Sequence, residues 1–413
     1  MMLRLDRERL VATMEEQATY GATEDGGLHR LALTEADREI RDWFVARLRA
    51  ADLTVRVDEF GNVFGRRAGT DPDAAPVLVG SHLDSQPNGG IYDGALGVIA
   101  ALEFVRTLDD EGIETARPVE IVNWTNEEGS RFQPAMQGSG VWAGSHDIDV
   151  EYAKTDDDGV ALGAALDEIG YRGDVPAEPA TEYDAYLELH VEQGPTLAEA
   201  GAAVGVVTGI VGFTWGAVTF RGEADHSGPT PMHHRSDALV AAADLITAVR
   251  RIPGTLGERT VGTVGYIDAE PNSINVIPEE VTVTWGFRDP DDETVERAYR
   301  RVLAEADHAA AREGADVETE ERMRAPAITF PDRTVDAVRR AADARDCRHL
   351  DLVSGAGHDA THLASVCDTG MVFAASEGGK SHSPAEFTSW DDCYEAATVL
   401  ANAALERATG TEK

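Results

Sequence analysis

Short apolar segments that lead directly into histidines or carboxylates recur along this 413-residue chain. In chain order, the predicted strands and the polar groups at their ends are residues 76–80 with His82, 119–124 with Glu127 and Glu128, 185–191 with His190, and 371–374 with His382. Apolar residues at helical spacing predict helices over residues 34–51 and 94–108. This alternation of strands and helices favours an α/β fold with a mostly parallel sheet. Because parallel sheets bind ligands beyond the carboxyl ends of their strands, these polar groups are expected to lie near one another.

The polar groups form a set of metal ligands. The candidate ligands are His82, Asp93, His190, His382 and one or both of the adjacent Glu127 and Glu128. Imidazoles mixed with carboxylates suit zinc or manganese, with cobalt or nickel also possible. Two such ions about 3.5–4 Å apart can share a hydroxide and polarise a carbonyl group. The sequence therefore predicts a hydrolase that uses two divalent metal ions per subunit.

Each ligand taken alone has an ordinary structural explanation. Asp93 precedes a predicted helix and could be an N-cap, and His82 or His190 could be a hydrogen-bonded loop histidine. The joint pattern at successive strand ends favours the metal site. Since a metal-bound imidazole donates its second N–H to a nearby acceptor, Asp84 is expected to orient His82. Of the adjacent carboxylates Glu127 and Glu128, one is expected to be a ligand and the other a base.

The segment 212–330 has a different pattern. Its predicted elements are a strand (214–221), a helix (236–251), a strand pair (260–267 and 281–288), a second helix (292–313) and a last strand (315–322). This βαββαβ order is compatible with a ferredoxin-like α+β domain. Because His190 precedes the segment and His382 follows it, we expect 212–330 to be inserted into a catalytic domain formed by 1–211 and 331–413.

The charge balance is extreme, with 75 acidic residues against 36 basic ones and a formal net charge of −39. Only three of the basic residues are lysines: Lys154, Lys380 and Lys413. Such a surface repels nucleic acids and anionic membranes, which need basic patches. No apolar run approaches the roughly 20 residues of a membrane span, and the N-terminus lacks the apolar core of a signal peptide. We therefore expect a cytoplasmic protein in a high-salt cytosol, the alternative being an acidic protein of ordinary salinity.

Five longer motifs resemble one amidase group. They are GSHLDSQPNGG (80–90), NEEGSRF (126–132), ELHVEQGP (188–195), ADHSGPTPM (224–232) and GAGHDA (355–360). Together they are similar to the hydantoinase/carbamoylase branch of the dinuclear-metal aminoacylase and carboxypeptidase superfamily. That branch contains N-carbamoyl-L-amino-acid hydrolases, allantoate amidohydrolases and β-ureidopropionases. The resemblance covers nearly the whole chain in order.

The resemblance implies a role for each matching residue. His82 and His190 would bind one metal, Glu128 and His382 the other, Asp93 would bridge them, and Glu127 would be the general base. The inserted domain would be a lid that also forms a homodimer interface. It would supply the substrate contacts His226, Asn275 and Arg288, with His226 reaching across from the partner subunit; Gln193 and Gly357 are further candidates.

Ordinary explanations remain for several of these residues. Arg288 suits bidentate capture of a carboxylate but could form a surface ion pair. Asn275 could serve a turn, and the loop around Gly357 could be an anion-binding or a plain loop.

The expected function is hydrolysis of the ureido C–N bond of N-carbamoyl-L-amino acids to amino acid, ammonia and carbon dioxide. Alternatives are an allantoate amidohydrolase or β-ureidopropionase, an aminoacylase or dipeptidase, and a binding protein without turnover. An intact Glu127 argues against the last, because a pure binding site needs no unliganded base.

Overall fold

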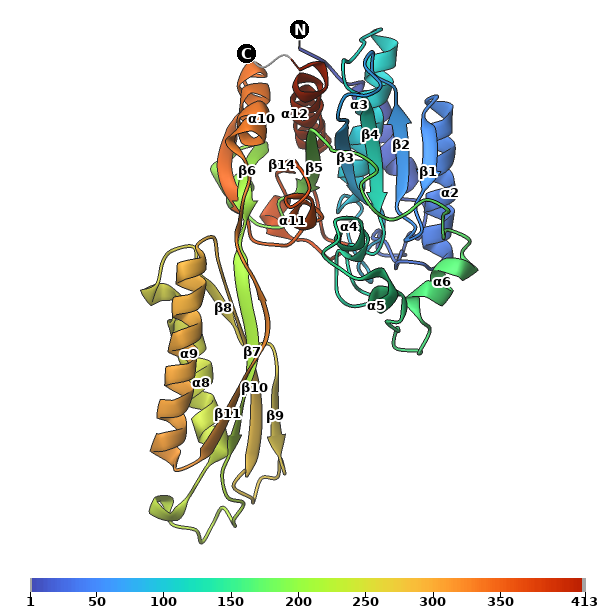
Figure 1. Ribbon diagram of the computed structural model, residues 1–413. Helices are drawn as coiled ribbons and strands as arrows, with labels where there is room; N and C mark the ends of the chain where they lie inside the picture. The colour runs from blue at the N-terminus through green and yellow to red at the C-terminus, as the bar shows by residue number, and fades with distance from the viewer. Residues whose placement is uncertain (1, 411–413) are drawn as a thin grey trace. The chain divides into compact units, whose positions relative to one another are not determined.

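The computed structural model describes residues 2–410, which form two compact units. One unit comprises the residues up to Thr208 and from Phe330 onward, and the other is Gly209–Thr329. Each unit has its own sheet (Figure 1). No helix among residues 2–410 has both the length and the apolar character needed to cross a bilayer.

The first unit is built around a nine-stranded sheet with the order β1-β2-β4-β3-β5-β14-β6-β12, in which β13 also pairs with β6. The strands of this sheet are β1 (Thr54–Val57), β2 (Val63–Arg67), β3 (Val77–His82), β4 (Val119–Trp124), β5 (Ala185–Val191), β6 (Val204–Ile210), β12 (Ile328–Thr329), β13 (His349–Ser354) and β14 (Asp368–Ala374). The boundary between the units crosses this sheet, because the last residues of β6 and all of β12 belong to Gly209–Thr329. Its helices are α1 (Arg7–Gln17), α2 (Glu35–Ala50), α3 (Ala95–Asp110), α4 (Gln137–Trp142), α5 (Ile148–Tyr152), α6 (Leu162–Glu168), α7 (Thr196–Ala200), α10 (Asp332–Ala344), α11 (Ala360–Leu363) and α12 (Trp390–Thr409).

The four central strands β4, β3, β5 and β14 run parallel, whereas β1, β2, β6 and β12 join at the two sides through antiparallel pairings. The predicted α/β class is confirmed. The central strands are buried along their whole length apart from the first residue of β14, which explains why they read as continuous apolar runs. His82 pairs with Trp124, and His190 pairs with Phe373, so the carboxyl ends of these strands meet at one edge.

The long helix α3 follows β3 and supplies much of the core of this unit. It packs closely because Gly97 faces the backbone of β5: a Cβ at this position would lie 2.3 Å from the carbonyl oxygen of Leu189. A larger residue at position 97 would push the helix away from the strand that carries His190.

The second unit is a five-stranded antiparallel sheet with the order β11-β7-β10-β8, in which β9 also pairs with β10. Its strands are β7 (Gly212–Arg221), β8 (Val261–Thr263), β9 (Ile267–Glu270), β10 (Glu280–Asp289) and β11 (Asp316–Ala325), and its helices are α8 (Ala238–Arg251) and α9 (Asp292–Glu313). Both helices pack on one face of the sheet (Figure 1), over Val218, Phe220, Val283 and Phe287. The observed order is βαβββαβ, which matches the expected βαββαβ order except for one additional strand. The strand expected over 260–267 is divided into β8 and β9, with the interruption at Gly265, a residue that weakens strands.

Candidate metal centre

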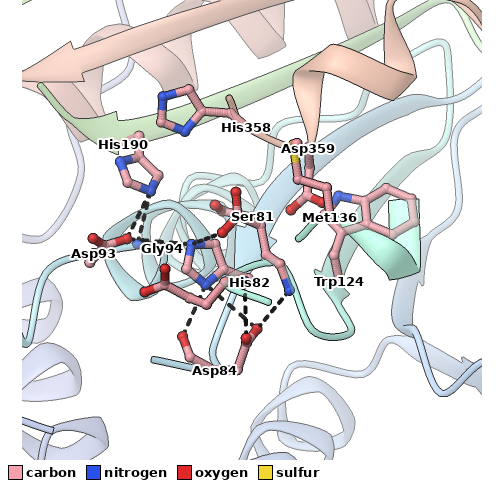
Figure 2. Close-up of polar contacts among 12 residues, drawn as sticks. Ser81, His82, Asp84, Asp93, Gly94, Trp124, Met136, His190, His358 and Asp359 are labelled. Atoms are coloured by element: carbon pink, nitrogen blue, oxygen red, sulfur yellow. Dashed lines mark hydrogen bonds and ion pairs between the residues drawn. The ribbon is translucent and has the colours of Figure 1, made fainter. Parts of the chain in front are cut away.

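Five side chains from four strand ends converge at the carboxyl edge of the central sheet. His82, Asp93 and His190 form one cluster, and Asp93, Glu128 and His382 form a second. Within each cluster the ligand atoms lie within 4.8 Å of one another. Figure 2 shows the imidazoles of His82 and His190 next to each other, both directed toward the Asp93 carboxylate. The structure thus brings together all five residues that the sequence suggested as ligands.

Asp93 belongs to both clusters and uses a different oxygen for each. Its Oδ1 lies 3.0 Å from His190 Nε2 and 3.4 Å from His82 Nε2. Its Oδ2 lies 3.6 Å from His382 Nε2, which in turn is 3.4 Å from Glu128 Oε2. A carboxylate that divides its oxygens in this way can bridge two cations.

The hydrogen bonds of the two buried histidines direct Nε2 toward this carboxylate. Nδ1 of His82 donates to the backbone carbonyl of Asp84 at 3.0 Å, and Nδ1 of His190 donates to the carbonyl of Val191 at 3.0 Å. Such bonds fix the orientation of a metal-binding imidazole. Nε2 of His82 is buried without a hydrogen-bond partner among the described residues, which is costly unless it binds something else.

The surrounding charge also favours a cation at this position. Burial, the largest single effect, lowers the pKa of His82, yet Glu127, Asp93 and Asp84 together raise it well above its usual value. Two carboxylates, three imidazoles and an orphaned buried nitrogen therefore fit a pair of divalent metal ions.

Gly94 makes room for this arrangement. Its φ angle is +61°, and a Cβ at this position would lie 2.3 Å from Nε2 of His82. The glycine therefore allows the chain to turn from Asp93 into α3 directly against the imidazole.

Asp84 holds the turn that carries the two adjacent glutamates. Its carboxylate accepts hydrogen bonds from the backbone N–H groups of Glu127 and Glu128, each at 3.2 Å. Asn126, immediately before them, has a φ of +54° and completes a tight turn. The role expected for Asp84 is thus divided, because its backbone carbonyl orients His82 while its carboxylate orients the turn.

The turn sends the two glutamate side chains to different places. Glu128 faces His382, and Gln86 holds its Oε2 at 2.9 Å. Glu127 instead places Oε2 3.5 Å from Nε2 of His82 and is outside both clusters. This geometry supports one ligand and one free base.

The carboxylates of the site have shifted pKa values. Burial by itself would raise the pKa of Asp93, but the imidazoles of His190 and His82 hold it well below its usual value. Burial raises the pKa of Glu127 well above its usual value, with His82 opposing the shift. Burial and the charge of Asp93 raise the pKa of Glu128 to about 8. A base of raised pKa retains a proton that it has accepted, as general acid–base catalysis requires.

Three further side chains orient Asp93. Gln193 and Ser381 each donate to Oδ2 of Asp93 at 3.0 Å. Glu386 accepts the backbone N–H of Asp93 at 3.1 Å and the hydroxyl of Ser381 at 2.9 Å, so it joins the loop before α3 to the His382 loop. Gln193 was expected to be a substrate contact, and its amide already binds Asp93. Ser381 and Glu386 were missed, although both lie within four residues of His382.

A second group missed by the sequence reasoning lies behind the histidines. The ring of His358 is 4.4 Å from that of His190, and Glu188 accepts hydrogen bonds from Ser81 at 2.7 Å and from the backbone N–H of Ala360 at 3.0 Å. These contacts fasten β3, β5 and the 355–360 loop together behind the ligands (Figure 2). In the same loop, Gly357 is exposed.

The expected substrate contacts of the second unit fall at opposite ends of its sheet. Arg288 pairs with Phe213 near one end of the β7–β10 ladder. His226 and Asn275 lie beyond the other end, where the N–H of Ser227 donates to the carbonyl of Asn275 at 3.0 Å. Nδ1 of His226 accepts the N–H of Gly228 at 3.0 Å, so an N–H remains available at Nε2.

Comparison with known proteins agrees with this site. Residues 78–406 match peptidase family M20/M25/M40. The N-carbamoyl-L-amino-acid amidohydrolase of Rhizobium meliloti is 42% identical over 405 residues, covering 98% of this chain and 97% of that protein. The allantoate amidohydrolase of Bacillus subtilis is 34% identical, covering 91% of this chain and 92% of that protein.

A solved structure gives the same result for the fold. The crystal structure of a hydantoinase/carbamoylase-family amidase from Burkholderia multivorans matches this chain with a TM-score of 0.94 and 44% sequence identity. The match covers 98% of this chain and 99% of that one.

Proposed function

Because the chain belongs to peptidase family M20/M25/M40 and within it to the hydantoinase/carbamoylase amidases, we propose that it hydrolyses N-carbamoyl-L-amino acids to amino acid, ammonia and carbon dioxide. The observation that carries the proposal is the placement of Glu127. This carboxylate lies beside the ligand clusters, 3.5 Å from His82, without belonging to either cluster. A site for metal storage or for structural metal would have no use for it.

His82 and His190 would hold one divalent ion, Glu128 and His382 a second, and Asp93 would bridge them. When bound, these ions supply Lewis-acid polarisation of the ureido carbonyl and acidify a water molecule. Such help is needed because two nitrogen atoms donate electrons into that carbonyl and make it a poor electrophile. Zinc and manganese suit the donor set equally, and availability decides between them.

Glu127 performs the proton transfers. Its carboxylate accepts a proton from the attacking water, and the C–O bond then forms at the ureido carbon. The same carboxyl group delivers the proton to the departing nitrogen as the C–N bond breaks. Burial raises the pKa of Glu127, so its carboxylate is a stronger base than that of an exposed glutamate.

The inserted unit supplies the substrate contacts. Arg288 holds the substrate carboxylate as a bidentate donor. His226 donates through Nε2 to the oxyanion of the tetrahedral intermediate, and Asn275 donates through its amide. Gln193 keeps Asp93 in place, and the loop around Gly357 would offer backbone N–H groups to the substrate.

The distances within the unit support a homodimer. Arg288 and Glu280, at the two ends of β10, are eight residues apart, or about 27 Å in an extended strand. His226 lies beyond the Glu280 end, so one copy of the unit cannot place Arg288 and His226 on one small substrate. Two copies can, if His226 comes from the partner subunit.

Complementation between inactive variants tests this arrangement. Mixtures of His226→Ala and Arg288→Ala chains, unfolded and refolded together, should regain about a quarter of wild-type activity. Random pairing makes half of the dimers contain one chain of each variant. In each of these dimers, one of the two active sites has both a native His226 and a native Arg288. Activity that stays at the level of the single variants would refute the shared site.

The high-salt cytosol remains part of the proposal. The charge of −39 and the scarcity of lysine support it. The enzyme should accordingly be assayed in molar KCl.

Ammonia release by metal-stripped protein resupplied with manganese or zinc tests the function. N-carbamoyl-L-amino acids, allantoate, 3-ureidopropionate and an N-acetyl amino acid are offered side by side. Metal-dependent turnover of a carbamoyl amino acid with slow turnover of allantoate is expected. Preference for allantoate would keep the mechanism and change the substrate, whereas turnover of the acetyl compound alone would refute the ureido assignment.

A further inference from the structure

The face of the second sheet that carries Arg288 has a hollow of about 410 Å³. It is lined by Trp215, Gly216, Val261, Thr263, Gly265, Thr284, Trp285, Gly286, Arg288 and Arg322. Helices α8 and α9 cover the opposite face of this sheet. The hollow is within the size range of small-molecule sites, which starts at about 300 Å³.

Two reciprocal tryptophan–glycine pairs lie in the part of the sheet that bears this hollow, one on each face. Across the β7–β10 ladder, Trp285 pairs with Gly216, and Trp215 pairs with Gly286. A Cβ on Gly216 would lie 2.4 Å from the ring of Trp285, and one on Gly286 would lie 2.9 Å from the ring of Trp215. Each indole therefore rests directly on a bare backbone, a known way of covering glycines in strands.

The two indoles differ in their exposure. Trp285 is 2% exposed and belongs to the core under the helices. Trp215 is 42% exposed, which is far more than covering a glycine requires. A large apolar ring left open at the wall of a hollow is typical of a ligand site.

Trp215 also lies beside the guanidinium expected to bind substrate. Cζ of Arg288 is 5.9 Å from the ring of Trp215 and 5.9 Å from the ring of Phe213, and these two rings are 5.1 Å apart. Stacking against aromatic faces holds a guanidinium in a defined orientation. In an α-amino acid, the side chain and the carboxylate are attached to the same carbon. A carboxylate on Arg288 therefore brings the side chain within reach of Trp215.

We infer that Trp215 and the hollow around it form the side-chain subsite, which selects ureido amino acids with large apolar or aromatic side chains. The inference rests on the proposed function and names its substrate class. Val261 adds apolar surface to the hollow, and the hydroxyls of Thr263 and Thr284 can form hydrogen bonds with only a few polar groups of a ligand. The second ureido group of allantoate would find only the hydroxyls of Thr263 and Thr284 as side-chain acceptors here, and 3-ureidopropionate has no side chain to fill the space.

A dicarboxylate ligand is the competing occupant, because Arg322 also lines the hollow. This arginine is bonded to Glu320 at 2.8 Å and its side chain is 53% exposed, so solvent screens its charge. The apolar occupant is therefore favoured.

Selectivity between substrates tests the inference. The kcat/KM values are measured for N-carbamoyl-L-phenylalanine, N-carbamoylglycine and N-carbamoyl-L-aspartate. The wild-type enzyme should prefer the phenylalanine compound over the other two. Trp215→Ala should lower kcat/KM for the phenylalanine compound about 10- to 100-fold, mainly through KM, and change the value for the glycine compound less than about threefold. Trp215→Phe should restore most of the loss.

Thr219→Ala, at the far end of the same strand, is the matched control and should leave all ratios unchanged. An equal loss for every substrate in Trp215→Ala, an unchanged ratio, or preference for the aspartate compound would overturn the inference.

Binding separates this inference from the proposed function. Calorimetry measures the affinity of N-carbamoyl-L-phenylalanine for Glu127→Gln protein with and without Trp215→Ala. If wild-type protein hydrolyses no ureido compound but binding weakens at least tenfold without Trp215, the function fails and the subsite stands. If hydrolysis occurs and neither binding nor selectivity depends on Trp215, the subsite fails alone.

Discussion

Replacing Glu127 by glutamine tests the centre of the mechanism. The amide keeps the size and shape of the side chain and removes its ability to accept a proton. Glu127 is 7% exposed, so solvent cannot readily replace it. Positioned acid–base groups contribute about 10²- to 10⁴-fold to rates, and Glu127 would serve both proton transfers. We therefore expect kcat to fall about 10³- to 10⁴-fold, or about 4–5.5 kcal/mol of barrier at 1.36 kcal/mol per tenfold.

No neighbouring carboxylate is placed to take over this role. Asp84 accepts two backbone N–H groups, and Glu128 is held by both the backbone and the side chain of Gln86. Asp93 accepts hydrogen bonds from Gln193 and Ser381. Each of these carboxylates is already held by hydrogen bonds, so none of them should replace Glu127 as the base and restore part of the lost activity.

The assay follows ammonia release, with metal content measured by mass spectrometry and substrate affinity by calorimetry. Glu127→Gln should retain both metals and bind substrate within about threefold of wild type. Glu168→Gln, which removes one exposed negative charge from α6, is the control and should be fully active. A kcat within tenfold of wild type would refute the base assignment. Loss of metal together with activity would instead make Glu127 a ligand.

Three other predictions follow from the structure. Ser381→Ala removes a hydrogen bond to Asp93 and should weaken metal affinity about 10- to 100-fold in equilibrium dialysis; unchanged affinity would contradict the orienting role. Burial and the neighbouring His146 lower the pKa of His362 to about 4. As the pH drops from about 6.5 toward 4, this histidine is therefore protonated in the unfolded chain but still neutral in the folded protein, and the free energy of unfolding falls. His362→Gln should recover about 1–3 kcal/mol at pH 5 in urea titrations and little at pH 8; an equal effect at both pH values would be inconsistent with this titration. Because salt screens the charge of −39, the melting temperature should rise between 0.1 and 2 M KCl, and a constant or falling value would contradict the high-salt proposal.

The metal ligands could be predicted because each depends on its local sequence. His82 and His190 lie within buried strands, and Glu128 follows one within four residues. Neighbouring parallel strands end at the same edge, so a one-dimensional pattern is enough to bring these groups together. The α/β class followed from the same alternation.

The residues that orient the ligands were less predictable, because they act across long stretches of chain. Glu386 binds the backbone N–H of Asp93 from 293 positions away, and Ser381 binds the Asp93 carboxylate from 288 positions away. No periodicity in the sequence records such a contact. The one hint in the sequence was the position of Ser381, which immediately precedes the candidate ligand His382.

Two of the helices that were missed, α1 and α12, lack the amphipathic pattern on which sequence reasoning depends, whereas α10 (Asp332–Ala344) shows that pattern and was overlooked. α12 (Trp390–Thr409) is rich in alanine and buries residues on several sides, including Cys393, Val399 and Leu400. A helix enclosed in a core has no polar face, so it shows little amphipathic periodicity. α1 is short and mostly polar, and its buried residues include Thr13 and Gln17.

The substrate contacts pose a different problem, because here the order along the chain conceals the geometry. His226 and Arg288 belong to the same inserted unit, yet the antiparallel ladder between β7 and β10 separates them to opposite ends. The resemblance implied that His226 reaches across from a partner subunit, and the ladder supplies a physical reason for this expectation. The fold therefore adds two observations that support these proposals: the length of β10 separates Arg288 from His226, and Trp215 lies on the sheet face that carries Arg288.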